Sequence, residues 1–196
     1  ERSAVVRFKV VGEDAYFLAW TTTPWTLPSN TALCVNPSET YCKVKAVDGK
    51  VYYMAQALLD KVLSKLAEEG QKAYEVLETY VGKDLEYKEY EPLFDFVKPT
   101  CEKQNKKGHY ITCDSYVTMT DGTGIVHIAP GFGEDDAEIG RKEGLPALCP
   151  IDAEGKFVAE VTDYQGEYVK SVDKAIIRRL KDEGKLVKQE TYQHSY

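Results

Sequence analysis

Short apolar segments separated by turn residues constrain the fold of this 196-residue chain more than any other sequence feature. Residues 5–11 and 15–20 flank Gly12-Glu13-Asp14, and residues 41–47 and 50–54 flank Asp48-Gly49. Each pair is typical of a β-hairpin, and Asp-Gly is the usual signal for a type I′ turn. Further strand-like segments lie at 31–35, 74–90 (with a break at Gly82), 110–119 and 125–129.

Three other segments are expected to be helices: 56–69 and 172–183 from their apolar spacing, and 135–143 from the acidic residues in its first turn. The 172–183 segment has Ser171 as a candidate N-cap and Gly184 as a stop. Strand-like segments outnumber helical ones, and the 14 tyrosines favour strands. We therefore expect a β-rich α+β fold, a β-barrel with peripheral helices, with residues 1–196 as a single domain. The predicted buried stripes are Leu58, Leu59, Val62, Leu63 and Leu66 in the first helix and Val172, Ile176 and Leu180 in the last.

Charge and cysteine content exclude several classes of protein. The net charge of −7 argues against tight autonomous binding to nucleic acid, because phosphate contacts need Lys and Arg. The five cysteines are odd in number and show no Cys-x-x-Cys spacing, which gives no support for a zinc site or a disulfide framework. No apolar run reaches membrane-spanning length, and the first residues do not resemble a signal peptide. We expect free thiols, a cytoplasmic location and, since no initiator Met is present, a fragment of a longer protein.

Two segments could carry chemistry. Residues 20–30 read Trp-Thr-Thr-Thr-Pro-Trp-Thr-Leu-Pro-Ser-Asn, and their two prolines exclude a regular central strand. Threonines offer a hydroxyl beside a methyl, so such a segment can bind a polar group while measuring a small aliphatic one. Residues 122–136 place His127 in a short apolar strand and end in three acidic residues at a predicted helix start. Taken alone, each segment also fits an ordinary strand edge, core histidine or solvated helix turn.

Together, the two segments resemble the two signature segments of the editing domain of isoleucyl-tRNA synthetase, a class I aminoacyl-tRNA synthetase. The threonine-rich string 21–30 is similar to the first, and Gly-Thr-Gly-Ile-Val-His with Ala-Pro-Gly-Phe-Gly-Glu-Asp-Asp, ending at Asp136, is similar to the second. Tyr-Glu-Pro-Leu-Phe (90–94) and Cys-Pro-Ile-Asp (149–152) add to the likeness. Many bacterial members carry His-Gly where this chain has Phe132-Gly133, which leaves no second histidine there.

The resemblance implies a proofreading function. Editing domains of this family remove valine from the 3′-terminal adenosine ester of mischarged tRNA(Ile), and hydrolysis of valyl-adenylate is a second possible activity. The family's ATP-handling motifs His-Ile-Gly-His and Lys-Met-Ser-Lys-Ser do not occur, so we expect a deacylase without ligase activity. The expected partners are the tRNA 3′ end carrying valine and the remainder of the parent synthetase, with no membrane, metal or cofactor.

The same resemblance implies roles for particular residues. Asp136 would bind the α-ammonium of the amino acid, and Thr21, Thr22 and Thr23 would line the amino-acid pocket and the ester. Thr23 and His127 are candidates for the steric limit against isoleucine, with Trp20 and Asn30 as further substrate contacts. No Gly-x-Ser-x-Gly elbow occurs, so attack by a positioned water is expected, with backbone N–H groups or threonine hydroxyls stabilising the oxyanion.

Two other functions remain open at the level of sequence. The first is a non-catalytic tRNA-docking β-barrel, which would not need an ammonium-binding carboxylate. The second is an editing domain of valyl or leucyl type, although those relatives carry Thr-Thr-Arg-Pro where this chain has Thr23 before Pro24. For the tRNA backbone, Lys103, Lys106 and Lys107 are local candidates for a phosphate contact, although a solvated loop explains them better.

Overall fold

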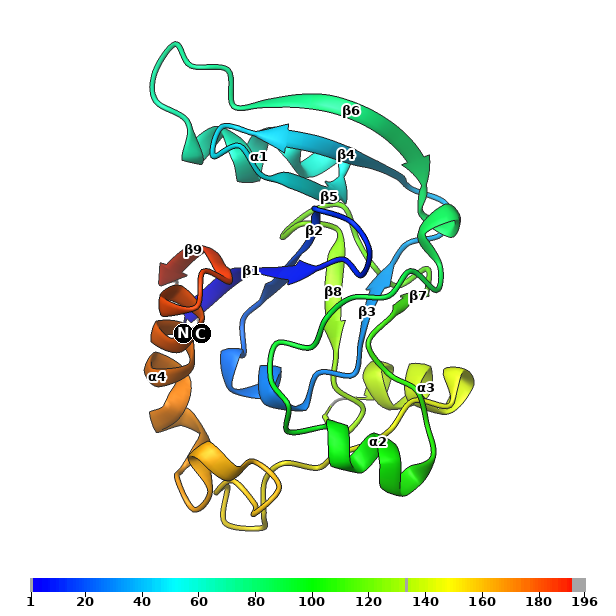
Figure 1. Ribbon diagram of the computed structural model, residues 1–196, viewed down its shortest axis with the longest axis vertical. Helices are drawn as coiled ribbons and strands as arrows, with labels where there is room; N and C mark the ends of the chain where they lie inside the picture. Colours follow the sequence, from blue (N-terminus) through cyan, green and yellow to red (C-terminus); the bar gives the residue numbers. More distant parts are fainter. Residues whose placement is uncertain (1, 133, 192–196) are drawn as a thin grey trace.

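Among residues 2–132 and 134–191, which this computed structural model describes, nine strands form one mixed sheet that curls into a half-barrel (Figure 1). The sheet runs in the order β6-β4-β5-β2-β8-β3-β7, and β1 pairs with both β2 and β9. This confirms the expected β-rich α+β class with peripheral helices. The strands are β1 (Arg2–Lys9), β2 (Tyr16–Thr21), β3 (Ala32–Val35), β4 (Thr40–Ala46), β5 (Val51–Ala55), β6 (Tyr74–Val81), β7 (Ile111–Cys113), β8 (Ile125–Ile128) and β9 (Leu186–Thr191).

Both predicted hairpins form, but one turn differs from its prediction. Strands β1 and β2 pair antiparallel, as do β4 and β5. Only Gly49 in the second turn has a positive φ, of 83°, whereas a type I′ turn needs two such residues. The Asp48 carboxylate accepts the Lys50 N–H at 2.9 Å and the Tyr52 hydroxyl at 2.5 Å. The type I′ prediction is therefore wrong, because the Asp48 side chain fixes the turn and Gly49 alone supplies the left-handed residue.

Two predicted strands are shorter than the sequence pattern indicated. The 110–119 segment forms only β7, because the Asp114 carboxylate accepts the Tyr116 N–H at 3.0 Å and turns the chain. The 74–90 segment forms β6 and then a 3₁₀ helix, η4 (Gly82–Leu85), which passes close to the backbone of Asn36. The predicted break at Gly82 is thus confirmed, but the strand does not resume as a regular element.

The helices lie at the periphery of the sheet (Figure 1): α1 (Leu59–Leu63), α2 (Lys98–Gln104), α3 (Glu134–Glu143) and α4 (Val169–Asp182). The predicted 56–69 helix is broken into η2 (Gln56–Leu58), α1 and η3 (Ser64–Leu66). Leu58, Leu59, Val62 and Leu63 are buried as expected, whereas Leu66 is only partly buried. Helix α4 begins before Ser171, whose hydroxyl donates to the Tyr168 carbonyl, so the predicted N-cap is wrong. Its predicted stripe of Val172, Ile176 and Leu180 is buried.

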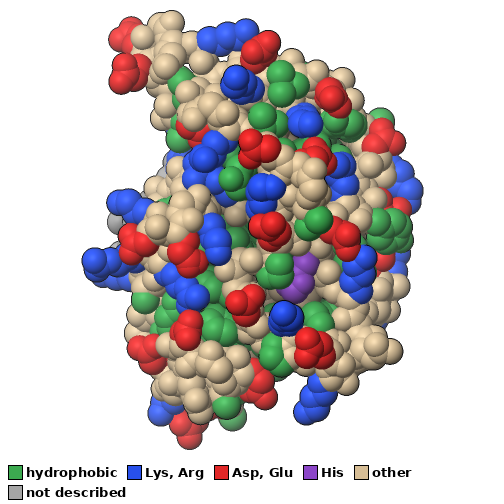
Figure 2. All heavy atoms as spheres, in the orientation of Figure 1, with side chains coloured by type: hydrophobic (Ala, Val, Ile, Leu, Met, Phe, Trp, Pro, Cys, Tyr) green, Lys and Arg blue, Asp and Glu red, His purple; other side chains and the backbone are tan. Residues whose placement is uncertain are grey.

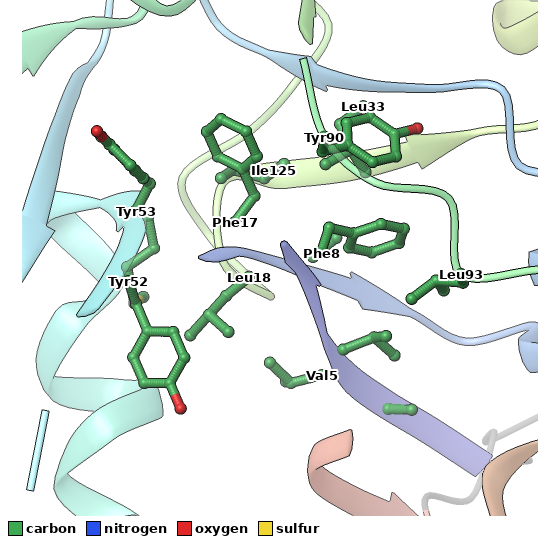
Figure 3. Close-up of a cluster of buried hydrophobic side chains, with 14 of the residues drawn as sticks. Val5, Phe8, Phe17, Leu18, Leu33, Tyr52, Tyr53, Tyr90, Leu93 and Ile125 are labelled. Atoms are coloured by element: carbon green, nitrogen blue, oxygen red, sulfur yellow. The ribbon is translucent and has the colours of Figure 1, made fainter. Parts of the chain in front are cut away.

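The main core lies inside the curl of the sheet (Figure 3). Phe8 and Phe17 meet there across the first hairpin, and Tyr90 packs edge-on against Phe8 with ring centroids 5.2 Å apart. On the face shown in Figure 2, acidic and basic side chains are interspersed. Within residues 2–132 and 134–191, no helix is both long and apolar enough to cross a membrane.

The fold brings the two motif segments together. Strand β8, from the second segment, lies between β2 and β3, which flank the first. Trp20 pairs with Val126 in the parallel β2–β8 ladder, and Leu33 pairs with His127 in the antiparallel β3–β8 ladder. Between β2 and β3 the chain forms the 3₁₀ helix η1 (Pro24–Ser29), in agreement with the prediction that two prolines exclude a central strand here.

Candidate functional site

A cavity of about 330 Å³ opens where the end of β2, η1, β8 and the start of α3 meet. At about 30 Å³ per water molecule, this volume corresponds to roughly eleven waters. It exceeds the volume of an aliphatic side chain and suits an amino acid with part of a ribose. Six of the seven residues predicted for the site line it, and Asn30 lies behind its wall. The lining residues are Trp20, Thr21, Thr22, Thr23, Thr26, Val126, His127, Ala129, Phe132, Glu134, Asp135 and Asp136.

Asp136 projects into this cavity from the first turn of α3. One carboxylate oxygen accepts the Ala129 N–H at 3.0 Å, which ties the helix to the end of β8. Desolvation raises the pKa of Asp136 from 3.8 to about 6; the neighbouring Asp135 adds to this rise, and the Ala129 N–H opposes it. A partly desolvated carboxylate with one hydrogen bond from the protein is well suited to bind a ligand cation.

The electrostatics of the cavity favour a cation as well. Glu134 and Asp135 line it beside Asp136, whereas none of the described lining residues is Lys or Arg. In the described ranges, no group of three or more His, Cys, Asp or Glu side chains could hold a metal ion. The cavity therefore presents a negative potential, which attracts an ammonium group and repels a phosphate.

Three of the four threonines form hydrogen bonds with one another, and the fourth, Thr22, does not. Thr21 Oγ1 accepts the Thr23 N–H at 3.1 Å, and Thr23 Oγ1 lies 3.2 Å from Thr26 Oγ1. The Thr26 hydroxyl donates to the Thr23 carbonyl at 2.8 Å, which closes the first turn of η1. Thr22 forms no side-chain hydrogen bond within the described part of the chain. Its hydroxyl is therefore the most available for a bound molecule, a distinction that the sequence did not reveal.

His127 is fixed in one tautomer by its neighbours. The Asn30 side-chain nitrogen donates to the Ala32 carbonyl at 2.9 Å, which orients the amide and directs its other N–H to His127 Nδ1 at 3.3 Å. Nδ1 must then be an acceptor, and Nε2–H donates to Thr26 Oγ1 at 2.7 Å. Desolvation lowers the pKa of His127 to about 4, so the ring is neutral near pH 7.

Behind the cavity, Asn30 connects His127 to the core. The buried Tyr90 hydroxyl donates to Asn30 Oδ1 at 2.5 Å, so every polar atom of the amide is used. Asn30 was predicted as a substrate contact, but it is 4% exposed and reaches the cavity only through His127. The motif at 90–94 includes Tyr90, but the sequence alone did not indicate its hydrogen bond to Asn30.

Two further contacts hold the rim of the cavity. Asp173 of α4 accepts the Trp25 N–H at 2.9 Å and anchors the start of η1. The Trp25 and Phe132 rings pack edge to face with centroids 4.9 Å apart, which joins the first segment to the second. Phe132 therefore forms part of the wall of the cavity. Gly133 lies outside the described residues.

Comparison with known proteins relates the whole chain to one family of synthetases. It is 47% identical over 190 residues to the isoleucine–tRNA ligase of Treponema denticola, covering 93% of the chain and 17% of that protein. Identity is 46% over 197 residues to the Clostridium novyi enzyme, covering 100% and 18%, and 44% to the cytoplasmic mouse enzyme, covering 94% and 14%. The chain thus spans less than a fifth of the length of these relatives. No family model matches it.

Solved structures establish the fold independently. The cytosolic leucyl-tRNA synthetase editing domain of P. falciparum superposes with a TM-score of 0.75 at 12% identity, covering 98% of this chain and 100% of that one. The leucyl-tRNA synthetase structure titled GlLeuRS-CP1 superposes with a TM-score of 0.70 at 13% identity, with the same coverage. At such low identity the likeness shows the fold alone.

Proposed function

We propose that this chain, which belongs to the isoleucyl-tRNA synthetase family and has the fold of a class I synthetase editing domain, hydrolyses the ester between valine and tRNA(Ile). The observation that carries the proposal is the position of Asp136. Its carboxylate is partly desolvated and lines a threonine-lined cavity together with two further acids and without Lys or Arg. Such a site suits a ligand with an ammonium group beside a small aliphatic side chain, as in an aminoacyl ester.

In the proposed complex, Asp136 binds the α-ammonium of valine. At about 4 Å and an effective dielectric constant of about 20, two unit charges attract by roughly 4 kcal/mol before any desolvation cost. Part of that desolvation cost is already present in the folded protein itself, because burial has raised the pKa of Asp136. The bound ammonium would lower this pKa again and keep the carboxylate ionised.

The limit on side-chain size is proposed to reside in Thr23, Thr26 and His127. Hydrogen bonds join these three residues, so the wall resists displacement by a larger ligand. Valine and isoleucine differ by one methylene, worth about 0.8 kcal/mol, and isoleucyl-tRNA synthetase is itself the reference case for correcting such weak discrimination at a second site. Forcing the extra methylene against a fixed wall costs about 1–3 kcal/mol, which corresponds to roughly 5- to 150-fold in rate.

The proposed reaction is direct attack by water. The water oxygen adds to the ester carbonyl, the ribose oxygen leaves and takes up a proton, and the products are valine and tRNA with a free 3′ end. His127 does not serve as the base, because Nδ1 already accepts a hydrogen bond and Nε2 carries a proton. The Thr22 hydroxyl and the neighbouring hydroxyl of the terminal ribose remain to position the water. This reaction consumes water and no other co-reactant, and we propose neither a cofactor nor a metal for it.

The proposed partners are tRNA(Ile) and the remainder of a longer synthetase. The proposed location is the cytoplasm. Residues 1–196 would act as one editing unit within it. The acidic net charge implies that the chain alone binds whole tRNA weakly, since most phosphate contacts would lie elsewhere in the synthetase.

Single-turnover deacylation of valyl- and isoleucyl-tRNA(Ile), with the chain in excess, tests the proposal. We expect the valyl ester to be hydrolysed about 5- to 150-fold faster, and Asp136→Ala to abolish the reaction. Glu138→Ala, an exposed acid on the same helix, provides the control and should retain activity. Equal hydrolysis of both esters, or an active Asp136→Ala, would contradict the proposal. Binding of tRNA without hydrolysis would instead indicate a docking domain, and a preference for esters on tRNA(Val) or tRNA(Leu) a valyl- or leucyl-type domain.

A further inference from the structure

His109 is a half-buried residue in the loop between α2 and β7, and the proposed reaction gives it no task. Its φ is 66°, in the left-handed region, where residues with a Cβ atom are uncommon. Histidine is found there more often than most residues, and such a conformation persists where surrounding contacts hold it. His109 contacts Asn30, Thr31 and Tyr90, and two of these residues support His127 behind the cavity.

Two donors of His109 bind two consecutive carbonyl groups. Its backbone N–H donates to the Thr31 carbonyl at 2.5 Å, and its ring Nε2 lies 3.2 Å from the Asn30 carbonyl oxygen. A carbonyl oxygen only accepts, so Nε2 carries the proton. Burial lowers the pKa of His109, so the ring is neutral near pH 7 and donates through Nε2. Both hydrogen bonds fix the backbone where η1 passes into β3.

His109 also holds the Tyr90 ring. The Tyr90 N–H donates to the His109 carbonyl at 3.1 Å, and the two rings pack edge to face with centroids 5.7 Å apart. Phe8 packs edge-on against the same tyrosine, which is 2% exposed (Figure 3). A ring confined in this way directs its hydroxyl to one place, and that hydroxyl donates to Asn30 Oδ1.

Asn30 is therefore held by His109 in two ways. His109 binds the backbone carbonyl of Asn30 directly, and it confines the tyrosine that binds the side-chain oxygen. The amide nitrogen of Asn30 donates to the Ala32 carbonyl at 2.9 Å and to His127 Nδ1 at 3.3 Å. The bond to His127 is the longest that the amide makes, so a small rotation of Asn30 breaks it first. Such a rotation would release the ring that limits the size of the bound side chain.

We propose that His109 is a positioning residue that sets the discrimination between valyl and isoleucyl esters by holding Asn30, and through it His127, in place. This inference rests on the proposed function. His109 is outside the set of described residues that line the cavity, so its effect on the ester is indirect. Its loss should act mainly on the isoleucyl ester, which presses on the wall, because Asp136 and Thr22 keep their own positions.

Single-turnover deacylation of valyl- and isoleucyl-tRNA(Ile) by variants of the chain tests the inference. His109→Phe keeps a ring against Tyr90 but removes the donor to Asn30. It should lower the ratio of valyl to isoleucyl hydrolysis about 2- to 10-fold and change the valyl rate by less than about twofold. His109→Asn favours the left-handed backbone but is too short to reach the Asn30 carbonyl, so it should lower the ratio as well.

A conservative variant and a matched control accompany these two. His109→Gln carries a side-chain N–H near the position of Nε2, and it should retain more of the ratio than His109→Phe. Tyr87→Phe is the control, because Tyr87 also has a left-handed φ, of 70°, and its side chain is 59% exposed. This control should leave the ratio unchanged.

The ring ¹⁵N NMR signals of His127 provide a readout that a general loss of stability does not move. They should show the Nε2–H tautomer in the wild type and in Tyr87→Phe, and a mixture of tautomers in His109→Phe and His109→Asn. Urea unfolding of each variant establishes that it is folded under the assay conditions. Folded His109 variants that keep the wild-type ratio, or that slow both esters equally, would overturn the inference alone. A wild type that hydrolyses both esters equally would overturn the proposed function and this inference together.

Discussion

Replacing Asp136 with Asn should make the protein more stable and less active at the same time. Asn has nearly the same shape and can still accept the Ala129 N–H, so the change removes mainly the charge. Loss of a charged hydrogen bond to the substrate ammonium costs about 1.5–3 kcal/mol, which lowers kcat/KM for valyl-tRNA(Ile) roughly 10- to 150-fold.

The stability gain follows from the raised pKa of Asp136. A shift from 3.8 to about 6, at about 1.4 kcal/mol per pKa unit, sets a ceiling of about 3 kcal/mol on the cost of ionising the carboxyl in the folded protein. The side chain is partly open to the cavity, so solvent screening reduces this to roughly 1–1.5 kcal/mol. Because the folded state holds the proton more tightly than the unfolded state, the free energy of unfolding of the wild type falls by this amount as pH rises from about 4 to about 6.

Urea unfolding of the wild type and Asp136→Asn between pH 3.5 and 8 measures the effect. Apart from a constant offset, the difference in free energy of unfolding between the variant and the wild type should be near zero below pH 4 and should reach its full value above pH 6. Glu138→Gln, on an exposed position of α3, controls for loss of one negative charge and should show neither the activity loss nor the pH-dependent gain. A variant that loses activity but gains no stability across this pH range would refute the desolvated state inferred for the carboxylate.

Three further predictions concern the same site. In a pH–rate profile of the wild type, kcat/KM should fall as pH decreases below about 6, because protonation of Asp136 removes its charge. His127, with a pKa of about 4, should cause no further change in kcat/KM above pH 5. Thr22→Val should reduce hydrolysis about tenfold and change the unfolding free energy by less than about 0.5 kcal/mol, because only a bound molecule or water uses that hydroxyl. Tyr90→Phe should lower the free energy of unfolding in urea by about 1–3 kcal/mol, because it leaves buried Asn30 Oδ1 without a donor. It should also reduce the ratio of valyl to isoleucyl ester hydrolysis, because Asn30 then holds His127 less firmly. An unchanged ratio would show that Tyr90 does not affect the site.

Local sequence signals predicted the elements that depend on neighbouring residues. The hairpins follow from turn residues, and the irregular segment after β2 follows from its two prolines. The Asp48-Gly49 turn type was wrong because side-chain hydrogen bonds of Asp48 outweighed the usual preference of the dipeptide. The 110–119 strand was too long for a similar reason, since Asp114 turns the chain after β7.

The candidate site was predicted from resemblance, and its tertiary details were not. Among the threonines, the sequence does not reveal that Thr26 joins the wall while Thr22 has its hydroxyl available, because this depends on the path of η1. Lys103, Lys106 and Lys107 looked like candidates for a phosphate contact, but none of them lines the cavity of Asp136, and Lys107 pairs with Glu89.

A crystal structure of the chain with valyl-adenosine linked by an amide in place of the ester would test the central claim most directly. The predicted complex has the valine ammonium within hydrogen-bond distance of the Asp136 carboxylate, and the isopropyl group against Thr23 and His127. An ammonium that points away from Asp136, or an amino acid bound outside this cavity, would contradict the account.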